Sequence, residues 1–373
     1  MPGGCSFAPR LDAEADQTNI LVLVELNGGN DGLNTVVPFA DPNYARLRPR
    51  IAVAADQVVR LDERLGLHPG LAPLKPAWDS GEMAIVLGVG YPEPNLSHFR
   101  SIEIWDTASD SSEFLAAGWT ARAVTGRNAR RTADGIVLGR PYVGPLAGAG
   151  TRTIVMEGVG EFANAARRVT IPASLPANPM LAHVVATQTE VRKAGDDIYF
   201  KLQRPQPGLR AQFPRTSIGG QLSNAARLIA SDVDVPAIKV SLGGFDTHTN
   251  ERNTHDRLMR ELGDALAAFR EAMVERWLWH RVTVVTYSEF GRRVAENSGQ
   301  GTDHGTAAPH FVLGKGIKGG FYGRQPRLDD LANGNLRFAV DFRSIYATLV
   351  RRWWNGDAVG VFGRRYPEVG FLG

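Results

Sequence analysis

The amino-acid sequence predicts an α/β protein whose mostly parallel central sheet is flanked by helices on both faces, with a cap-like insertion. Short, nearly continuous apolar runs recur along the chain, and each ends at polar or glycine-rich residues. Such runs are typical of strands that are buried on both faces of a parallel sheet. A helical pattern lies between two of the runs, and 373 residues with 43% hydrophobic side chains suffice for a large core.

Four long strands and a shorter one are expected. The first run, Ile20–Leu26, ends at an Asn-Gly-Gly-Asn turn. Runs of the same character are Met83–Gly88, Pro236–Ser241 and Val282–Tyr287. His310–Leu313, before a glycine, is the candidate for the short strand. The turn residues after each run mark where the chain leaves the sheet.

Helical patterns accompany the later strands. Five apolar residues between the last two long strands recur at spacings of three or four and form one stripe: Leu258, Leu262, Leu266, Phe269 and Met273. Gln221–Ser231 is a second expected helix, and Asp341–Trp354 is a third near the C-terminus. Alternation of strands and helices predicts parallel pairing, with helices on both faces of the sheet.

The domain organisation expected from the sequence is simple. Residues 1–19 are interpreted as an N-terminal tail and residues 20–373 as a single domain. Between residues 107 and 220, glycine, alanine, arginine and proline interrupt the periodicity. This stretch is interpreted as an insertion over the sheet.

Composition excludes several classes of partner. The net charge of +3 comes without a dense basic run interleaved with aromatics, so no nucleic-acid partner is expected. A single cysteine, Cys5, allows no internal disulfide and no cysteine-based metal site. No apolar run approaches the ~20 residues that a membrane span needs. Residues 1–19 lack the layout of a signal peptide, which leaves a cytoplasmic protein or a removed signal as alternatives.

Polar side chains follow every long strand, where open parallel sheets bind their ligands. The loops after the first and second strands carry Asp31 and Ser97-His98, with Arg100 just beyond. Those that follow the other strands, together with one further loop, carry the remaining candidates: Asp246, His248, Glu289, Asp303 and His304. Carboxylates and imidazoles from separate loops are the usual ligands of Zn²⁺, Mn²⁺ or Mg²⁺. The sequence therefore predicts a divalent metal site (Zn, Mn, Mg or Ca) at one edge of the sheet.

Each fragment also has a plainer interpretation. An Asp-x-His such as Asp246 to His248 occurs often by chance as a turn. Asp31 fits an ordinary Asn-Asp-Gly turn, and Asp303-His304 between glycines fits a loop turn. The metal hypothesis depends on the recurrence of such residues at several strand ends.

Ser97 precedes a segment, Phe99–Trp105, that could form a helix. A serine at a helix start points into the positive end of the helix, where free N–H groups stabilise an anion. This placement suits a nucleophile that attacks a phosphate or sulfate, with Arg100 holding an equatorial oxygen. The alternative is a simple N-cap. His98 either orients the serine or a substrate, or only packs.

Several strings, taken together and in order, resemble the bacterial family called domain of unknown function 1501. They are GGNDGLNTVVP, the SHFRS..IW segment, Gly118-Trp119, GGFDTH, YSEFGRR..EN and GTDHG. The likeness runs over roughly residues 20–355. The family more distantly resembles the alkaline-phosphatase-like superfamily of phosphatases, sulfatases and phosphomutases. The resemblance implies that fold and a metal-dependent hydrolase of phosphate or sulfate esters, acting on an anionic small molecule or polymer.

The resemblance also implies roles for particular residues. Asp31 falls at the first-strand metal-binding aspartate, and Ser97 at the nucleophile. Asp246 falls at the aspartate that precedes the long helix, with His248 or His255 as its histidine partner.

Further along the chain, Glu289 occupies the place of an Asp-His pair after the next strand, and His304 matches a late histidine before the final strand. One imidazole of the superfamily pattern is therefore missing, and either Asp303 compensates for it or one metal site is lost. Two alternatives follow, a non-catalytic binding or assembly protein with a degenerate site and a single-metal enzyme of other chemistry. Family members commonly carry a twin-arginine export signal, so a mature form would be periplasmic or secreted.

Overall fold

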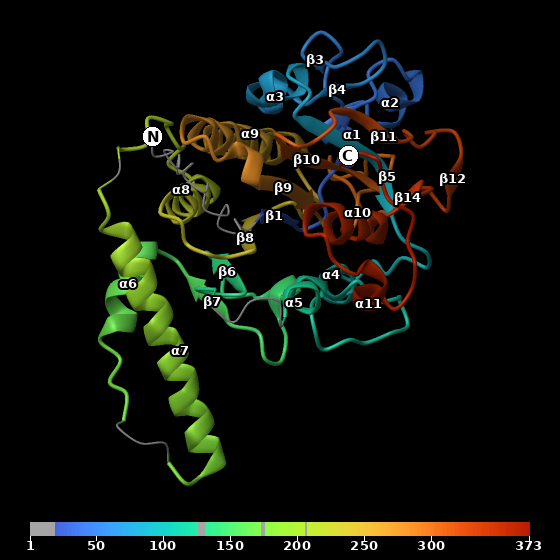
Figure 1. Cartoon of the computed structure of the whole chain (residues 1–373). Coiled ribbons are helices and arrows are strands. Elements are labelled where there is room, and N and C mark those ends of the chain that lie inside the picture. The colour runs from blue at the N-terminus through green and yellow to red at the C-terminus, as the bar shows by residue number, and fades with distance from the viewer. Residues whose placement is uncertain (1–18, 126–130, 173–175, 206) are drawn as a thin grey trace, which may run out of the picture.

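A computed structural model describes residues 19–125, 131–172, 176–205 and 207–373 (Figure 1). At its centre lies a nine-stranded sheet with the order β11-β5-β10-β9-β1-β8-β6-β7, and β14 pairs with β5. The strands are β1 (Ile20–Asn27), β5 (Met83–Gly90), β6 (Gly135–Leu138), β7 (Thr153–Met156), β8 (Ala237–Gly243), β9 (Val282–Tyr287), β10 (Ala308–Gly314), β11 (Gly320–Gly323) and β14 (Val340–Asp341). Within this sheet β10 runs antiparallel to β5 and β9, and the remaining pairings are parallel. The predicted fold class is confirmed.

Helices and short strands complete the chain. The α-helices are α1 (Gly32–Thr35), α2 (Pro42–Leu47), α3 (Lys75–Asp79), α4 (His98–Thr107), α5 (Trp119–Val124), α6 (Val159–Arg167), α7 (Pro179–Leu202), α8 (Ser217–Ala230), α9 (Glu251–Glu275), α10 (Phe342–Thr348) and α11 (Ala358–Phe362). The small strands are β2 (Val36–Val37), β3 (Val59–Arg60), β4 (Gly66–Leu67), β12 (Leu331–Ala332) and β13 (Asn335–Leu336). The predicted helix Asp341–Trp354 is α10 continued by a π-helical segment, Leu349–Trp353.

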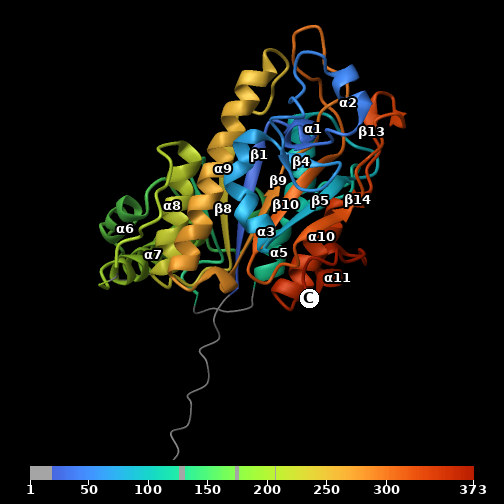
Figure 2. The same cartoon turned by 90° about the horizontal axis from the view of Figure 1, so that it is seen from above.

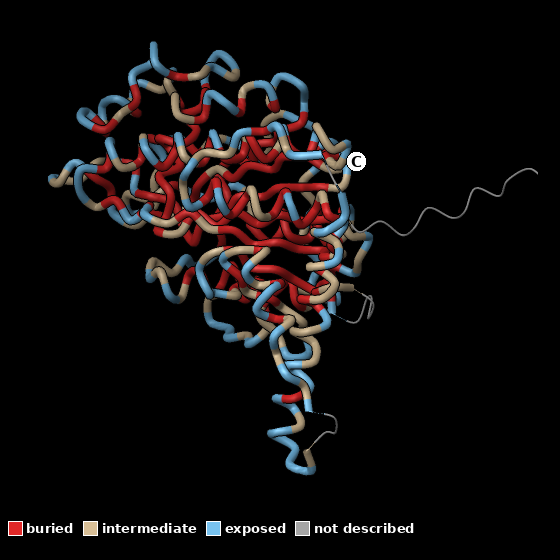
Figure 3. Tube along the Cα trace, turned by 90° about the vertical axis from the view of Figure 1, so that its left-hand side faces the viewer, coloured by how far each residue is buried: buried red, intermediate tan, exposed pale blue. Residues whose placement is uncertain are grey.

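Helices cover both faces of the sheet because alternate strand residues point to opposite sides. Val22 and Val24 of β1 belong to one buried cluster together with α8 and α9. Leu21 and Leu23 belong to the opposite cluster, which α4, α5 and α10 complete. Figure 2 shows α8 and α9 on one side of the molecule and α10 and α11 on the other, and Figure 3 shows that the buried residues concentrate at the centre of the molecule.

The apolar stripe predicted for the long helix lies on α9, and all five of its residues are buried: Leu258, Leu262, Leu266, Phe269 and Met273. Each such side chain contributes about 1.5–3 kcal/mol when it leaves water. This burial fixes α9 against the sheet, and with it the loop between β8 and α9.

Residues 107–220, expected as an insertion, supply two parts of the fold. Strands β6 and β7 extend the sheet beyond β8. Helices α6 and α7 form a hairpin that projects from the body (Figure 1). No helix of the described chain is both long enough and apolar enough for a transmembrane segment.

One edge of the sheet collects the loops that carry the predicted site. Strands β1, β5, β8 and β9 are mutually parallel, so their carboxyl ends lie at the same edge. Because β10 runs the other way, its amino end starts at that edge. Residues far apart in the sequence are thereby brought within reach of one another.

Candidate metal centre

Three histidines and one aspartate meet at this edge of the sheet. The Oδ1 atom of Asp246 lies 3.0 Å from His248 Nε2, 3.2 Å from His304 Nε2 and 3.4 Å from His98 Nε2. The Nε2 atoms of His248 and His304 are 3.0 Å apart. Ligand atoms of His98, Asp246 and His304 all lie within 4.8 Å of one another, close enough to share one metal ion.

The other ring nitrogen of each histidine is bonded to an oxygen. His304 Nδ1 donates to the carbonyl oxygen of Leu96 at 2.8 Å, and a carbonyl can only accept. His98 Nδ1 lies 2.7 Å from Glu289 Oε1, and His248 Nδ1 lies 3.3 Å from Asp303 Oδ1. In the tautomer that carries the proton on Nδ1, the three rings direct their Nε2 lone pairs to the same point.

Acceptors of this kind fix the orientation of metal-binding histidines and raise their basicity. Consistent with this arrangement, His98 Nε2 is buried and has no hydrogen-bond partner. The hydrogen bond that His98 donates to Glu289 raises the pKa of His98 against the effect of burial. The donor set of three imidazole nitrogens and one carboxylate oxygen therefore fits a divalent ion such as Zn²⁺ or Mn²⁺.

Backbone geometry brings the loops this close. Gly28, which follows β1, has φ +120, and a Cβ there would lie 2.5 Å from the Asp246 nitrogen. A Cβ on Gly301 would lie 2.3 Å from the carbonyl carbon of His248. Glycine at both positions is what lets the three loops approach one another.

Arg292 holds Asp246 in the ionised form. Its guanidinium is fully buried and donates to Asp246 Oδ1 at 2.7 Å and to the Gly29 carbonyl at 2.7 Å. Burial opposes ionisation of Asp246, but the hydrogen bond and charge of Arg292 outweigh it and lower its pKa to about 2. Asp246 remains 48% exposed, so a ligand can reach it from solvent.

Glu289 and Asp303 were predicted as metal ligands, and the structure places both behind a histidine. Glu289 is buried and also accepts from the Gly28 nitrogen at 2.9 Å. The hydrogen bond from Asn297 is the main cause of the lowered pKa of Asp303. Both carboxylates thus orient imidazoles at the cluster.

The structure places Asp31 in a different group of side chains. Its carboxylate is buried and paired with the buried guanidinium of Arg48. Burial alone would raise the pKa of Asp31, but the charge of Arg48 lowers it below the usual range. The neighbouring Glu251 has its pKa raised to about 9 by burial and by Asp31. The Asp31 carboxylate therefore already has a cationic partner.

His255, the alternative partner of Asp246, also lies in this second group. Its Nε2 is 3.1 Å from Asn30 Oδ1, and burial lowers its pKa to about 3. His248 is therefore the histidine that accompanies Asp246.

Arg100 is directed away from the predicted anion position. Its guanidinium donates to the carbonyl oxygens of Asp110, Ser111 and Glu113 and lies 3.9 Å from the ring centre of Phe114. These contacts hold the loop after α4 and leave the arginine no role at the cluster.

Ser97 is the residue before α4, and its neighbours on both sides contact the cluster. Leu96 accepts from His304, and His98 contributes its ring. The Ser97 side chain is exposed and makes no capping hydrogen bond to the helix. Its hydroxyl and the first N–H groups of α4 are thus available beside the cluster.

Replacing Glu289 by glutamine tests its orienting role. The variant keeps the shape but loses the negative charge behind His98, so the affinity for Zn²⁺ or Mn²⁺ should fall about 10–100-fold. Asp303→Asn should cost less, because that carboxylate is 54% exposed and its contact with His248 is longer, at 3.3 Å. Metal titration by calorimetry measures both affinities. Equal affinity in the wild-type protein and Glu289→Gln would contradict the assignment.

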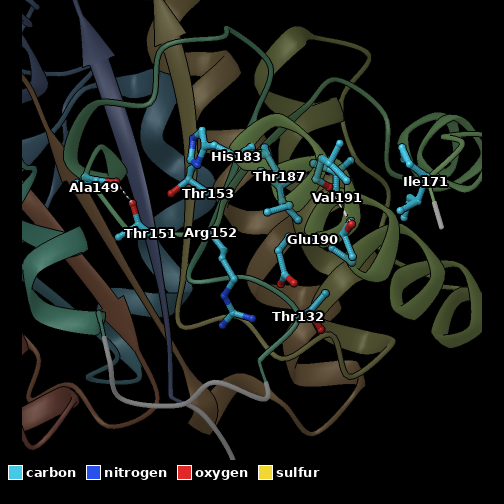
Figure 4. A pocket seen from close by; sticks show the side chains of 18 residues that line it. Thr132, Ala149, Thr151, Arg152, Thr153, Ile171, His183, Thr187, Glu190 and Val191 are labelled. Atoms are coloured by element: carbon cyan, nitrogen blue, oxygen red, sulfur yellow. Dashed lines mark hydrogen bonds between the residues drawn. The ribbon is translucent and has the colours of Figure 1, made fainter. Parts of the chain in front are cut away.

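A cavity of about 950 Å³ lies away from the histidine cluster, between the β7 edge and α7 (Figure 4). Its walls include Thr153, His183 and Glu190. None of the predicted site residues lines it.

The chain is similar to known proteins in sequence and in structure. The model of a family described as "Protein of unknown function (DUF1501)" matches residues 164–353. That match includes Asp246, His248 and His304, and it begins after Ser97 and His98. A comparison with curated proteins finds no match.

Among solved structures, the chain is similar to the C-terminal periplasmic domain of EcEptC from Escherichia coli in complex with Zn, at 9% identity and a TM-score of 0.41, over 80% of this chain and 73% of that one. It is similar to the PsFucS1 sulfatase from Pseudoalteromonas sp. at 8% identity and a TM-score of 0.41, over 91% and 68% of the two chains. A protein in the alkaline phosphatase superfamily from Vibrio parahaemolyticus matches at 10% identity and a TM-score of 0.37, over 94% and 67%.

Proposed function

We propose that this chain, which belongs to the family described as a protein of unknown function (DUF1501), hydrolyses a phosphate or sulfate ester at a single divalent ion. The proposal comes from the geometry of the metal centre. The observation that carries the proposal is the convergence of three Nε2 atoms on Asp246, each from a ring whose Nδ1 is held by an oxygen. When each ring carries its proton on Nδ1, the three Nε2 lone pairs and the Asp246 oxygen repel one another unless a cation lies between them.

The residues that would hold the ion are His98, Asp246, His248 and His304. A divalent ion bound there would supply positive charge to the oxygens of a tetrahedral ester and stabilise their added negative charge. Arg292, behind Asp246, keeps that ligand ionised over the physiological range. The cluster opens to solvent, so an anionic substrate can approach it.

We propose Ser97 as the nucleophile. Its oxygen would form a bond to phosphorus or sulfur while the bond to the alcohol oxygen breaks, and the hydroxyl proton would leave with the alcohol. Water would then cleave the seryl ester and restore Ser97, so that one water is consumed for each ester. The free N–H groups at the start of α4 would stabilise the negative oxygens during both steps.

Ser97→Ala is the direct test of the nucleophile. With a panel of chromogenic phosphate monoesters, phosphate diesters and sulfate esters, we expect turnover of the preferred substrate to fall at least about a thousandfold. Bound metal should not change, because the hydroxyl is not among the converging ligand atoms. Ser112→Ala, an exposed serine of the loop after α4, is the control and should keep full activity. Unchanged turnover in Ser97→Ala would exclude the nucleophile role.

A second candidate follows from the ligand set itself. Imidazole and carboxylate ligands also suit iron and other redox-active ions. An enzyme of other single-metal chemistry would then use the same four side chains. Metal analysis of the purified protein and the ester panel separate the two: redox-active iron without ester hydrolysis would favour the second candidate.

A further inference from the structure

A smaller pocket of about 290 Å³ lies at the carboxyl ends of β6 and β8, on the same edge of the sheet as the metal centre. Gly243, the last residue of β8, lines this pocket and pairs with Asn27 at the end of β1. Asp246 follows Gly243 by three positions, so their Cα atoms are at most about 11 Å apart. A substrate of ordinary size can therefore reach both places at once.

Arg140 supplies an uncompensated positive charge in this pocket. Arg140 is exposed, and no hydrogen bond or ion pair joins its guanidinium to any of the residues that the structure describes, although its backbone carbonyl accepts from the Tyr142 nitrogen at 2.8 Å. A Cβ on Gly243 would lie 3.7 Å from Cζ and both terminal nitrogens of Arg140, so the planar guanidinium lies across the glycine. The charge of the other arginine in the pocket, Arg257, is balanced by Glu261 at 2.5 Å.

Polar groups on α8 form the remaining wall. Gln221 is occupied on both atoms, since Nε2 donates to the Ser241 carbonyl at 3.0 Å and Oε1 accepts from the Ser241 nitrogen at 2.8 Å. The Ser217 hydroxyl accepts from Gln221 Nε2 at 3.1 Å, which leaves its own hydrogen available to a ligand. The pocket thus offers a guanidinium and a hydroxyl donor, a pair that suits phosphate, sulfate or carboxylate oxygens.

We propose that this pocket binds a second anionic group of the substrate, on the order of 10 Å from the ester that reacts. The inference rests on the proposed function, because it treats the metal centre as the place where the ester binds. It narrows the substrate class to esters with two separated negative groups. Arg140 is then the specificity-determining residue, and its contribution is to substrate binding.

Alkane α,ω-bisphosphates of two to eight methylenes, compared with the matching alkyl monophosphates, test the proposal by calorimetry on the metal-loaded protein. For the wild-type protein we expect the bisphosphate of the best length to bind at least about tenfold more tightly than its monophosphate. In Arg140→Gln this advantage should fall to about twofold or less. Arg168→Gln, an exposed arginine on the projecting hairpin, should keep the full advantage.

The outcomes separate this inference from the proposed function. An equal advantage in the wild-type protein and Arg140→Gln, or no advantage of any bisphosphate, would overturn the second anion site even if the protein hydrolyses esters. A length-dependent advantage that disappears in Arg140→Gln would support the site even if no ester in the panel is cleaved.

Discussion

Replacement of Asp246 by asparagine is expected to remove the bound metal and to abolish ester hydrolysis. The Nε2 atoms of the three histidines lie 3.0–3.4 Å from Asp246 Oδ1, so this oxygen is the point on which all three nitrogens converge. An amide keeps the shape of the side chain but loses the negative charge that offsets a divalent cation. Loss of an orienting group behind a ligand costs about 10–100-fold in metal affinity, and loss of the ligand itself should cost more than that.

Metal content after dialysis, measured by mass spectrometry, and turnover on the preferred ester should fall together in Asp246→Asn. Asp329→Asn is the matched control, because Asp329 is an exposed carboxylate paired with Arg327 at 2.7 Å on the surface. It should keep both metal and activity. Thermal unfolding of each variant, compared in the presence of a chelator, separates loss of metal from loss of fold. A fully metal-loaded Asp246→Asn would contradict the ligand assignment.

The fold could be predicted because its strongest signals are local. The long strands are continuous apolar runs, and α9 shows its stripe directly in the sequence. The strands that were not predicted are short or lie in glycine-rich sequence. β6 and β7 have four residues each, and β14 has two. At such lengths periodicity carries little information, and pairing with a neighbour decides the structure.

The candidate site could be predicted in position but not in its detailed roles. Asp246, His248 and His304 were chosen as candidates because they follow or precede strands whose ends meet at one edge, and the structure brings them together. The sequence does not show which nitrogen of a histidine faces the cluster, so it could not show that Glu289 and Asp303 contact Nδ1 atoms. The structure places each of them on an Nδ1 atom.

The environment of Asp31 was not visible in the sequence for a different reason. Arg48 lies in a loop with no sequence signal of its own, and its contacts depend on the packing of distant segments. It donates to the carbonyl oxygens of Arg293 and Val294 at 2.9 and 2.8 Å. Glu251, in the first turn of α9, was not predicted to lie beside Asp31 either.

Arg48→Met is expected to have the largest effect on stability of any substitution in this second group. The side chain of Arg48 is fully buried and pairs with Asp31, which is 1% exposed. Removal of one partner leaves an uncompensated charge in the interior, so the free energy of unfolding should fall by about 3–5 kcal/mol. The neighbouring Glu251 offers no compensation, because it is another carboxyl with a pKa raised to about 9.

The double variant Asp31→Asn/Arg48→Met distinguishes a charge effect from a packing effect. If the loss in Arg48→Met comes from the unpaired carboxylate, the double variant should recover much of it, since removal of both partners of a buried pair is often nearly neutral. Urea unfolding of the two single variants and the double variant measures the coupling. Metal analysis of the same variants tests the number of metal ions, because the Arg48 guanidinium beside Asp31 provides the charge that a second cation would otherwise supply. We therefore expect one ion per chain in the wild-type protein and in Asp31→Asn. Two ions in the wild-type protein and one in Asp31→Asn would show that Asp31 is a ligand.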